Sequence, residues 1–195
     1  MEKLKDYHVR EELFKYLEEQ YINCSDTIII NELGICQGQS RVDVAVVNGI
    51  MHGYEIKSES DTLERLPRQI EYYNKVFDRV TIVVAVDYLE HVKKMVPKWW
   101  GIISVRNRHG EIKLKKLRQG RANKKIDPFA VSQFLWKDEA LEILKEKGLQ
   151  RGYLSKPKRV ILEHLAETIE INELKDLVNL QLKQREGWRD HVLLM

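Results

Sequence analysis

Two carboxylates and one ammonium group lie close together on two predicted strands. Asp43 falls within the apolar run 42–47, which predicts a strand buried on both faces. A carboxylate in such a strand is costly unless it is paired, hydrogen-bonded or bound to a cation. Glu55 and Lys57 lie two residues apart on the next predicted strand, 54–57, so their side chains share a face. These residue types suit a hard divalent cation that holds and activates a phosphate.

The turn between the two strands decides whether the two acids can meet. A two-residue loop at 48–49 would leave Asp43 and Glu55 on opposite faces, because a slip of one residue reverses every side chain. A three-residue loop at 47–49 makes the two acids diagonal neighbours, and one at 48–50 places them directly opposite each other. The chemistry therefore requires an odd loop.

A third set of residues follows on a predicted helix, and the whole pattern resembles a known enzyme superfamily. Gln69 and Tyr73 are four residues apart and share a helix face. Asp43 followed by EIK at 55–57 resembles the D…ExK signature of the PD-(D/E)XK nuclease superfamily, and QIEYY is similar to the QxxxY motif of its RecB-like members. Most of the chain also resembles the bacterial and phage proteins of the sce7726 family. Val42 departs from the superfamily pattern, in which a proline precedes the aspartate.

The resemblance implies a fold and an activity. The fold would be α/β, a restriction-endonuclease-like αβββαβ core with a mixed sheet, and the activity metal-dependent hydrolysis of DNA phosphodiester bonds. The implied catalytic residues are Asp43, Glu55, Lys57 and Gln69. Asp43 and Glu55 would bind Mg²⁺ (or Mn²⁺), and Lys57 would orient the attacking water. An acid on the first helix joins the metal site in many relatives, so Glu12 is a weaker candidate for metal binding. The alternative is that Glu12 is a solvated glutamate on the helix surface.

Three more residues on this motif helix or just before it are candidates for nucleic-acid binding. Tyr73 would contact the nucleic-acid backbone, with a core aromatic as the alternative. Arg65 and Arg68 are placed to reach phosphates, although solvated helix charges fit them equally well.

Positive charge is concentrated in one segment of a chain whose net charge is only +3. Residues 105–125 hold nine Lys and Arg against a single acid, which indicates a surface directed at a polyanion. Within it Lys113, Lys115 and Lys116 alternate with apolar residues, so we expect a strand with a basic, DNA-binding face. The alternative is an edge strand that lysines protect from aggregation. We expect the preceding pair, Trp99-Trp100, to anchor a strand to the core, with base stacking as the alternative.

The hydrophobic pattern predicts a nuclease-like core at 1–125 and a C-terminal helical subdomain at 126–195. Before residue 126, we expect helices at 3–20 and 89–96 beside the motif helix, and strands at 27–32, 42–47, 54–57, 80–86, 102–105 and 112–117. After it, helices are predicted at 129–147, 157–169 and 173–185, forming a small bundle.

The remaining features concern compartment and partners. The sequence has no run of eighteen apolar residues and does not begin like a signal peptide, so we expect a cytoplasmic protein without membrane contact. Its two cysteines fit no metal-binding spacing. We expect DNA as the partner. The alternatives are a catalytically inactive nuclease-fold module that binds nucleic acid or protein, and a homodimer or protein complex formed through the C-terminal helices.

Overall fold

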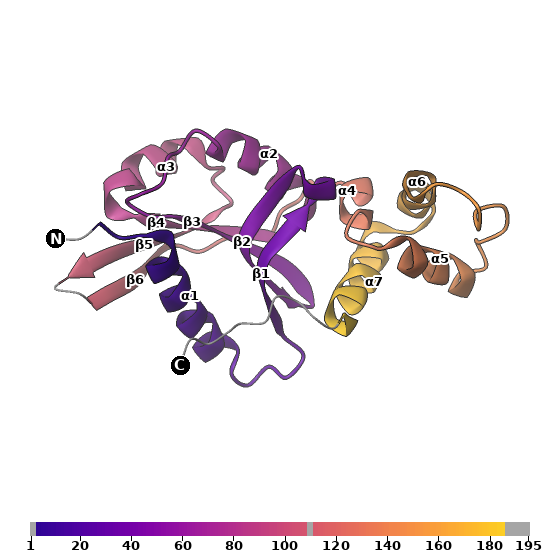
Figure 1. The fold of residues 1–195 in the computed structure, drawn as a ribbon, viewed down its shortest axis with the longest axis horizontal. Coiled ribbons are helices and arrows are strands. Elements are labelled where there is room, and N and C mark those ends of the chain that lie inside the picture. Colours follow the sequence, from indigo (N-terminus) through magenta and orange to yellow (C-terminus); the bar gives the residue numbers. More distant parts are fainter. Residues whose placement is uncertain (1–2, 109–110, 186–195) are drawn as a thin grey trace.

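A mixed β-sheet forms the centre of the computed structural model, which describes residues 3–108 and 111–185 (Figure 1). Its strands lie side by side in chain order. They are β1 (Ile28–Ile35), β2 (Ser40–Asn48), β3 (Ile50–Lys57), β4 (Arg79–Ala85), β5 (Gly101–Arg108) and β6 (Glu111–Arg118). These bounds confirm the predicted strands, most of them with an extension of a few residues.

The pairing of neighbouring strands changes from antiparallel to parallel and back across the sheet. The pairs β1–β2 and β2–β3 are antiparallel, β3–β4 and β4–β5 are parallel, and β5–β6 is antiparallel. Each parallel step has a helical crossover, α2 (Leu66–Val76) before β4 and α3 (Leu89–Met95) before β5. The order helix, three strands, helix, strand and the mixed α/β class are as the sequence predicts.

Helices cover both faces of the sheet. Helix α1 (Asp6–Tyr21) lies on one face, where its buried residues Leu13 and Leu17 join Val44 and Val46 of β2 in one hydrophobic cluster. Helices α2 and α3 lie on the opposite face (Figure 1). The alternating strand residues thus fill two cores, one on each face of the sheet.

The C-terminal region contains α4 (Pro128–Ser132), α5 (Lys137–Glu146), α6 (Lys158–Thr168) and α7 (Ile171–Gln184). The single helix expected at 129–147 is wrong, because the chain begins a new helix after Trp136. The Trp136 backbone is extended, and its N–H donates to the Glu139 carboxylate at 2.6 Å, a contact that starts α5. The helices expected at 157–169 and 173–185 are confirmed. No helix in the described residues is long and apolar enough to cross a membrane.

The C-terminal helices share a hydrophobic cluster with the sheet. Lys175 of α7 also forms an ion pair with the buried Asp78 at 2.5 Å, and Asp78 accepts a hydrogen bond from the Met51 N–H of β3 at 2.8 Å. The Asn179 side chain donates to the carbonyl of Gly49 at 3.2 Å. Helix α7 therefore supports the β2–β3 turn, while the division of the chain at residue 126 stays a prediction.

The β2–β3 hairpin has an odd loop centred on Gly49. Val47 pairs with Met51, and the paired register continues to Val44 and Tyr54. Gly49 has a φ of +66°, a left-handed conformation that glycine adopts without strain. Extending this register by one residue sets Asp43 opposite residue 55. The loop is therefore the 48–50 alternative that the chemistry permits.

Gly101, at the start of β5, offers a test of the packing. A Cβ there would lie 2.4 Å from the Thr81 hydroxyl oxygen and 3.1 Å from the Gly120 backbone nitrogen. We expect Gly101→Ala to lower the free energy of unfolding by about 1–3 kcal/mol in urea denaturation. Gly34→Ala is the matched control, because nothing lies within 4 Å of its Cβ position. The control should stay within about 0.5 kcal/mol of wild type, and equal losses in both variants would contradict the packing.

Candidate active site

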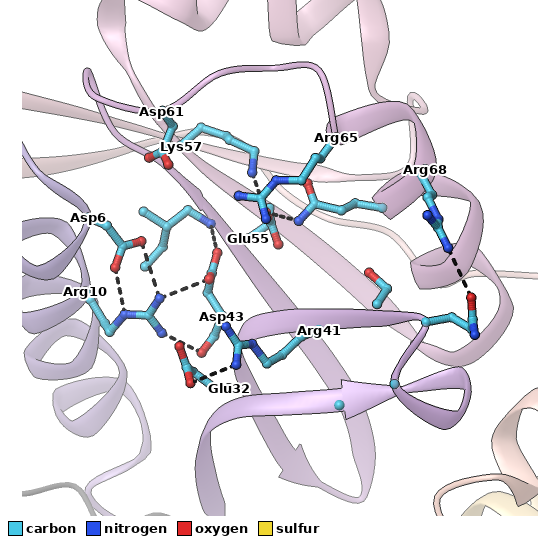
Figure 2. A pocket seen from close by; sticks show the side chains of 16 residues that line it. Asp6, Arg10, Glu32, Arg41, Asp43, Glu55, Lys57, Asp61, Arg65 and Arg68 are labelled. Atoms are coloured by element: carbon cyan, nitrogen blue, oxygen red, sulfur yellow. Dashed lines mark hydrogen bonds and ion pairs between the residues drawn. The ribbon is translucent and has the colours of Figure 1, made fainter.

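A cavity of about 730 Å³ lies beside the first residues of β2 and the last residues of β3, between α1 and the start of α2 (Figure 2). Ten charged side chains from the described residues line it: Asp6, Arg10, Glu32, Arg41, Asp43, Glu55, Lys57, Asp61, Arg65 and Arg68. Gln69 lines it as well. The structure thus brings together all four residues that the sequence marks as catalytic.

Glu55 is the most enclosed acid of this cavity, with 1% of its surface exposed. One of its carboxylate oxygens accepts hydrogen bonds from Lys57 Nζ and from Gln69 Nε2, each at 2.6 Å. The other oxygen accepts from the Tyr73 hydroxyl. Lys57 comes from the same strand face, and Gln69 and Tyr73 come from one face of α2. The ExK and QxxxY spacings therefore serve one carboxylate.

The surroundings of Glu55 raise its pKa from 4.5 to about 7. Burial is the largest cause, because it disfavours the charged form, and the negative charge of Asp43 adds to it. Lys57 acts in the opposite direction. Near neutral pH, a bound cation would relieve the cost of ionising this carboxylate.

Asp43 is held from two sides. Its Oδ2 accepts the Ile56 N–H of β3 at 2.7 Å, and its Oδ1 lies 3.0 Å from the guanidinium of Arg10. Arg10 also donates to the Asp43 carbonyl at 2.9 Å and forms an ion pair with Asp6 at 3.0 Å (Figure 2). Burial raises the pKa of Asp43, whereas the Ile56 N–H and Arg10 oppose that rise.

An irregularity in β1 lies beside Asp43. The β1–β2 ladder has partner pairs on both sides of Glu32 but none at Glu32 itself, whose φ is +57°. Such a φ is uncommon for a residue with a side chain. Glu32 forms an ion pair with Arg41 at 3.3 Å on the cavity wall. The break in the ladder therefore coincides with the part of β2 that supplies Asp43.

The donor set fits a hard divalent cation. The cavity offers the carboxylates of Asp43 and Glu55, and the side-chain oxygen of Gln69 is buried without a hydrogen-bond partner. Mg²⁺ commonly takes one or two carboxylates and completes its shell with water and substrate phosphate. In the described parts of the chain, no three His, Cys, Asp or Glu side chains form a closed metal cage.

Two predicted site residues need correction. Glu12 does not line the cavity, and its carboxylate lies 3.5 Å from Lys15 of the same helix. The acid that α1 contributes is Asp6, six residues earlier. Tyr73 is fully buried, so it does not contact nucleic acid. Its hydroxyl instead holds Glu55 and lies 2.7 Å from the Arg41 carbonyl.

The other predicted nucleic-acid contacts lie at two places. Arg65 and Arg68 are exposed on the cavity wall, and Arg68 donates to Gln39 at 3.1 Å. The lysines lie on the edge strand β6. Lys115 occupies the same row of the sheet as Lys57, three strands and about 14 Å away. Lys113 and Lys115 are exposed on this strand, outside the cavity, and Lys116 lines a separate small cavity.

Arg10 and Asp6 were missed by the sequence reasoning, although a signal exists. Positions 6, 10, 13 and 17 share one face of a helix, and the last two are buried leucines. Two opposite charges on an otherwise apolar stripe indicate side chains that are directed toward a buried partner.

Fold and site together define a mixed α/β protein in which a buried acid, Glu55, and a half-buried acid, Asp43, lie in a cavity that arginines also line. The chain belongs to the Bacteriophage P4 protein cII family, which it matches over residues 1–194. Protein cII of Enterobacteria phage P4 is 29% identical over 184 residues, covering 94% of this chain and 69% of that protein. A solved protein of unknown function from Silicibacter pomeroyi is 15% identical with a TM-score of 0.40, covering 70% of this chain and 90% of its own.

The raised pKa of Glu55 should make stability depend on pH. The folded chain keeps this proton up to about pH 7, whereas the unfolded chain loses it near 4.5. The stability from this group is therefore complete below about pH 4.5 and is lost as the pH rises through 7, by roughly 3 kcal/mol at most. Metal-free Glu55→Gln should lack this decline when the free energy of unfolding is measured across the range.

The control for that measurement is Glu71→Gln. Glu71 is exposed on α2, and its hydrogen bond with Lys75 lowers its pKa. This variant should keep the wild-type slope between pH 4.5 and 7. A Glu55→Gln slope equal to that of wild type would contradict the assignment of the raised pKa to Glu55.

Proposed function

We propose that this protein is a metal-dependent nuclease that hydrolyses DNA phosphodiester bonds on a restriction-endonuclease-like core. The observation that carries the proposal is the buried Glu55 carboxylate, which receives donors from Lys57, Gln69 and Tyr73 beside a second acid, Asp43. Active sites place such groups in clefts to shift their pKa values, and the pKa of Glu55 is raised in this way beside the half-buried Asp43. The resemblance of residues 43–73 to the D…ExK and QxxxY motifs supports the same conclusion.

Asp43 and Glu55 would hold the divalent cation, Mg²⁺ or Mn²⁺. When bound, such a cation polarises a phosphate and lowers the pKa of the attacking water. The unpartnered oxygen of Gln69 would accept a hydrogen bond from water in the same cavity. Arg10 would keep the main chain of β2 in place through the Asp43 carbonyl.

Lys57 would act on the developing charge of the phosphate. Its ammonium group is 3% exposed and is held at Glu55, so it enters the reaction already desolvated and positioned. A preorganised cation in a site of this kind stabilises the transition state more than the bound substrate. Arg65 and Arg68 on the cavity wall would bind the flanking phosphates.

A specific observation favours the second candidate, a nuclease-fold module that binds nucleic acid or protein without cutting. The Arg10 guanidinium already neutralises Asp43, so the acid has a cationic partner without a metal ion. The C-terminal region also exposes Trp136 and Leu180, which would suit a protein partner. Metal-dependent cleavage separates the two candidates.

The cleavage test uses linear, circular and single-stranded DNA with Mg²⁺ or Mn²⁺. Wild type should cut, and Lys57→Ala should cut at least about 10²-fold more slowly, the scale of losing one electrostatic donor. DNA affinity should change little, because Lys57 is buried and bound to Glu55. The exposed Lys156→Ala is the control and should cut at the wild-type rate.

Two results would argue against this mechanism. Equal cleavage by wild type and Lys57→Ala would remove Lys57 from the chemistry. No cleavage by wild type on any DNA substrate with either metal would favour the inactive binding module.

The basic strand β6 makes a separate prediction about binding. Lys113 and Lys115 are exposed, and they lie outside the proposed active site. Changing both to Gln should weaken duplex binding for all sequences alike. The slope of log affinity against log salt should shrink by about 0.9 for each phosphate that the variant no longer neutralises. The control is the double variant Lys145→Gln, Lys156→Gln in the C-terminal region, which should keep the wild-type slope. Equal slopes in all three proteins would mean that the lysines of β6 only protect a sheet edge from aggregation.

A further inference from the structure

A second cavity, of about 520 Å³, lies beside the end of α2 and outside the proposed active site. It is lined by Asn74 of α2, by Trp99 just before β5, and by the segment 121–125 that follows β6. None of the described residues that line it is acidic. It therefore differs in kind from the cavity between α1 and α2, which five acidic side chains line.

The segment 121–125 is held in place although it belongs to no helix or strand. The Arg121 N–H donates to the Trp99 carbonyl and the Asn123 N–H to the Asp78 carbonyl, each at 2.8 Å. The Asn123 side chain also donates to the carbonyls of Asn74 and Phe77 at 2.8 and 3.0 Å. The wall of the cavity is therefore fixed before any ligand binds, which lowers the entropy lost on binding.

The two tryptophans have different environments. Trp100 is fully buried, stacks on Tyr73 with ring centroids 6.0 Å apart, and donates from its indole nitrogen to Asn74 at 2.9 Å. Trp99 is only partly buried, meets Trp100 edge to face, and lines the cavity. Trp100 is thus the core anchor that the sequence predicts, and Trp99 is an aromatic side chain beside open space.

Three exposed cations line the cavity together with Trp99: Arg121, Lys124 and Lys125. None of the three forms an ion pair with a carboxylate within the described chain, and the side chain of Arg121 reaches only the Lys98 carbonyl at 3.5 Å. An aromatic side chain among unpaired cations is the combination that binds single-stranded nucleic acid, since bases stack on the ring and phosphates meet the charges.

We propose that this cavity binds single-stranded DNA, with an unpaired base stacked on Trp99 and its phosphates on Arg121, Lys124 and Lys125. A duplex cannot use Trp99 in this way, because its bases are already stacked on one another. The inference deepens the proposed function and rests on it for the identity of the polymer. Asn74 lies five residues, about 7.5 Å, along α2 from Gln69, which lines the proposed active site.

The test is binding of dye-labelled oligothymidylate, followed by fluorescence anisotropy in EDTA so that no cleavage occurs. Trp99→Ala should weaken binding by about tenfold or more, and Trp99→Phe should retain most of the affinity. Trp136→Ala is the matched control, because Trp136, just before α5, is 59% exposed and lies outside the cavity. Duplex affinity should be the same for Trp99→Ala and wild type.

Each remaining outcome decides the question. Equal affinities of Trp99→Ala and Trp136→Ala, or an equal loss on duplex DNA, would overturn the proposal. If thermal melting shows that Trp99→Ala does not fold, the double variant Lys124→Gln, Lys125→Gln is measured in its place. Its salt slope on single strands should fall by about 0.7 for each phosphate left without a cation, and an unchanged slope overturns the proposal. If wild type binds the oligonucleotide but cleaves no DNA, that result contradicts the proposed nuclease activity and still supports the single-strand binding site.

Discussion

The structure depends on the burial of one carboxylate, that of Glu55. Because the carboxylate has almost no contact with water, its oxygens need hydrogen-bond donors from the protein. Lys57 of β3 and Gln69 and Tyr73 of α2 supply them. This requirement fixes how α2 packs, because residues 69 and 73 must both face the strand. Trp100 then fixes the ring of Tyr73 by stacking on it. Replacing such a buried charged cluster by apolar residues is often neutral or stabilising, so its presence supports a functional explanation better than a structural one.

The second acid is placed by backbone geometry. The left-handed Gly49 gives the β2–β3 turn an odd loop, and α7 supports that turn through Asn179. The neighbouring ladder is interrupted at Glu32, beside Asp43. Arg10 then binds both the carboxylate and the carbonyl of Asp43. Residues from both ends of the chain therefore determine the geometry of a site whose motif spans about thirty residues.

The sequence predicted most of the fold because the strands are apolar runs and the helices have clear periodicity. It also predicted the acid pair, since Asp43, Glu55 and Lys57 have spacings that only an odd loop can combine. It failed where contacts are distant in sequence or depend on rotation of an element. Glu12 and Asp6 are both acids of α1, and only the packing of that helix shows which one faces the cavity. The burial of Tyr73 and the break before Trp136 likewise depend on tertiary contacts that local pattern does not contain.

The central claim is that Asp43 and Glu55 are held for a divalent cation. The most direct measurement is electron paramagnetic resonance of Mn²⁺ titrated into the metal-free protein at pH 8, above the pKa of Glu55. We expect one bound ion per chain in wild type, displaced by Mg²⁺ and absent from both Asp43→Asn and Glu55→Gln. Binding of Mn²⁺ with the same stoichiometry and affinity in all three proteins, or no binding in wild type, would contradict it.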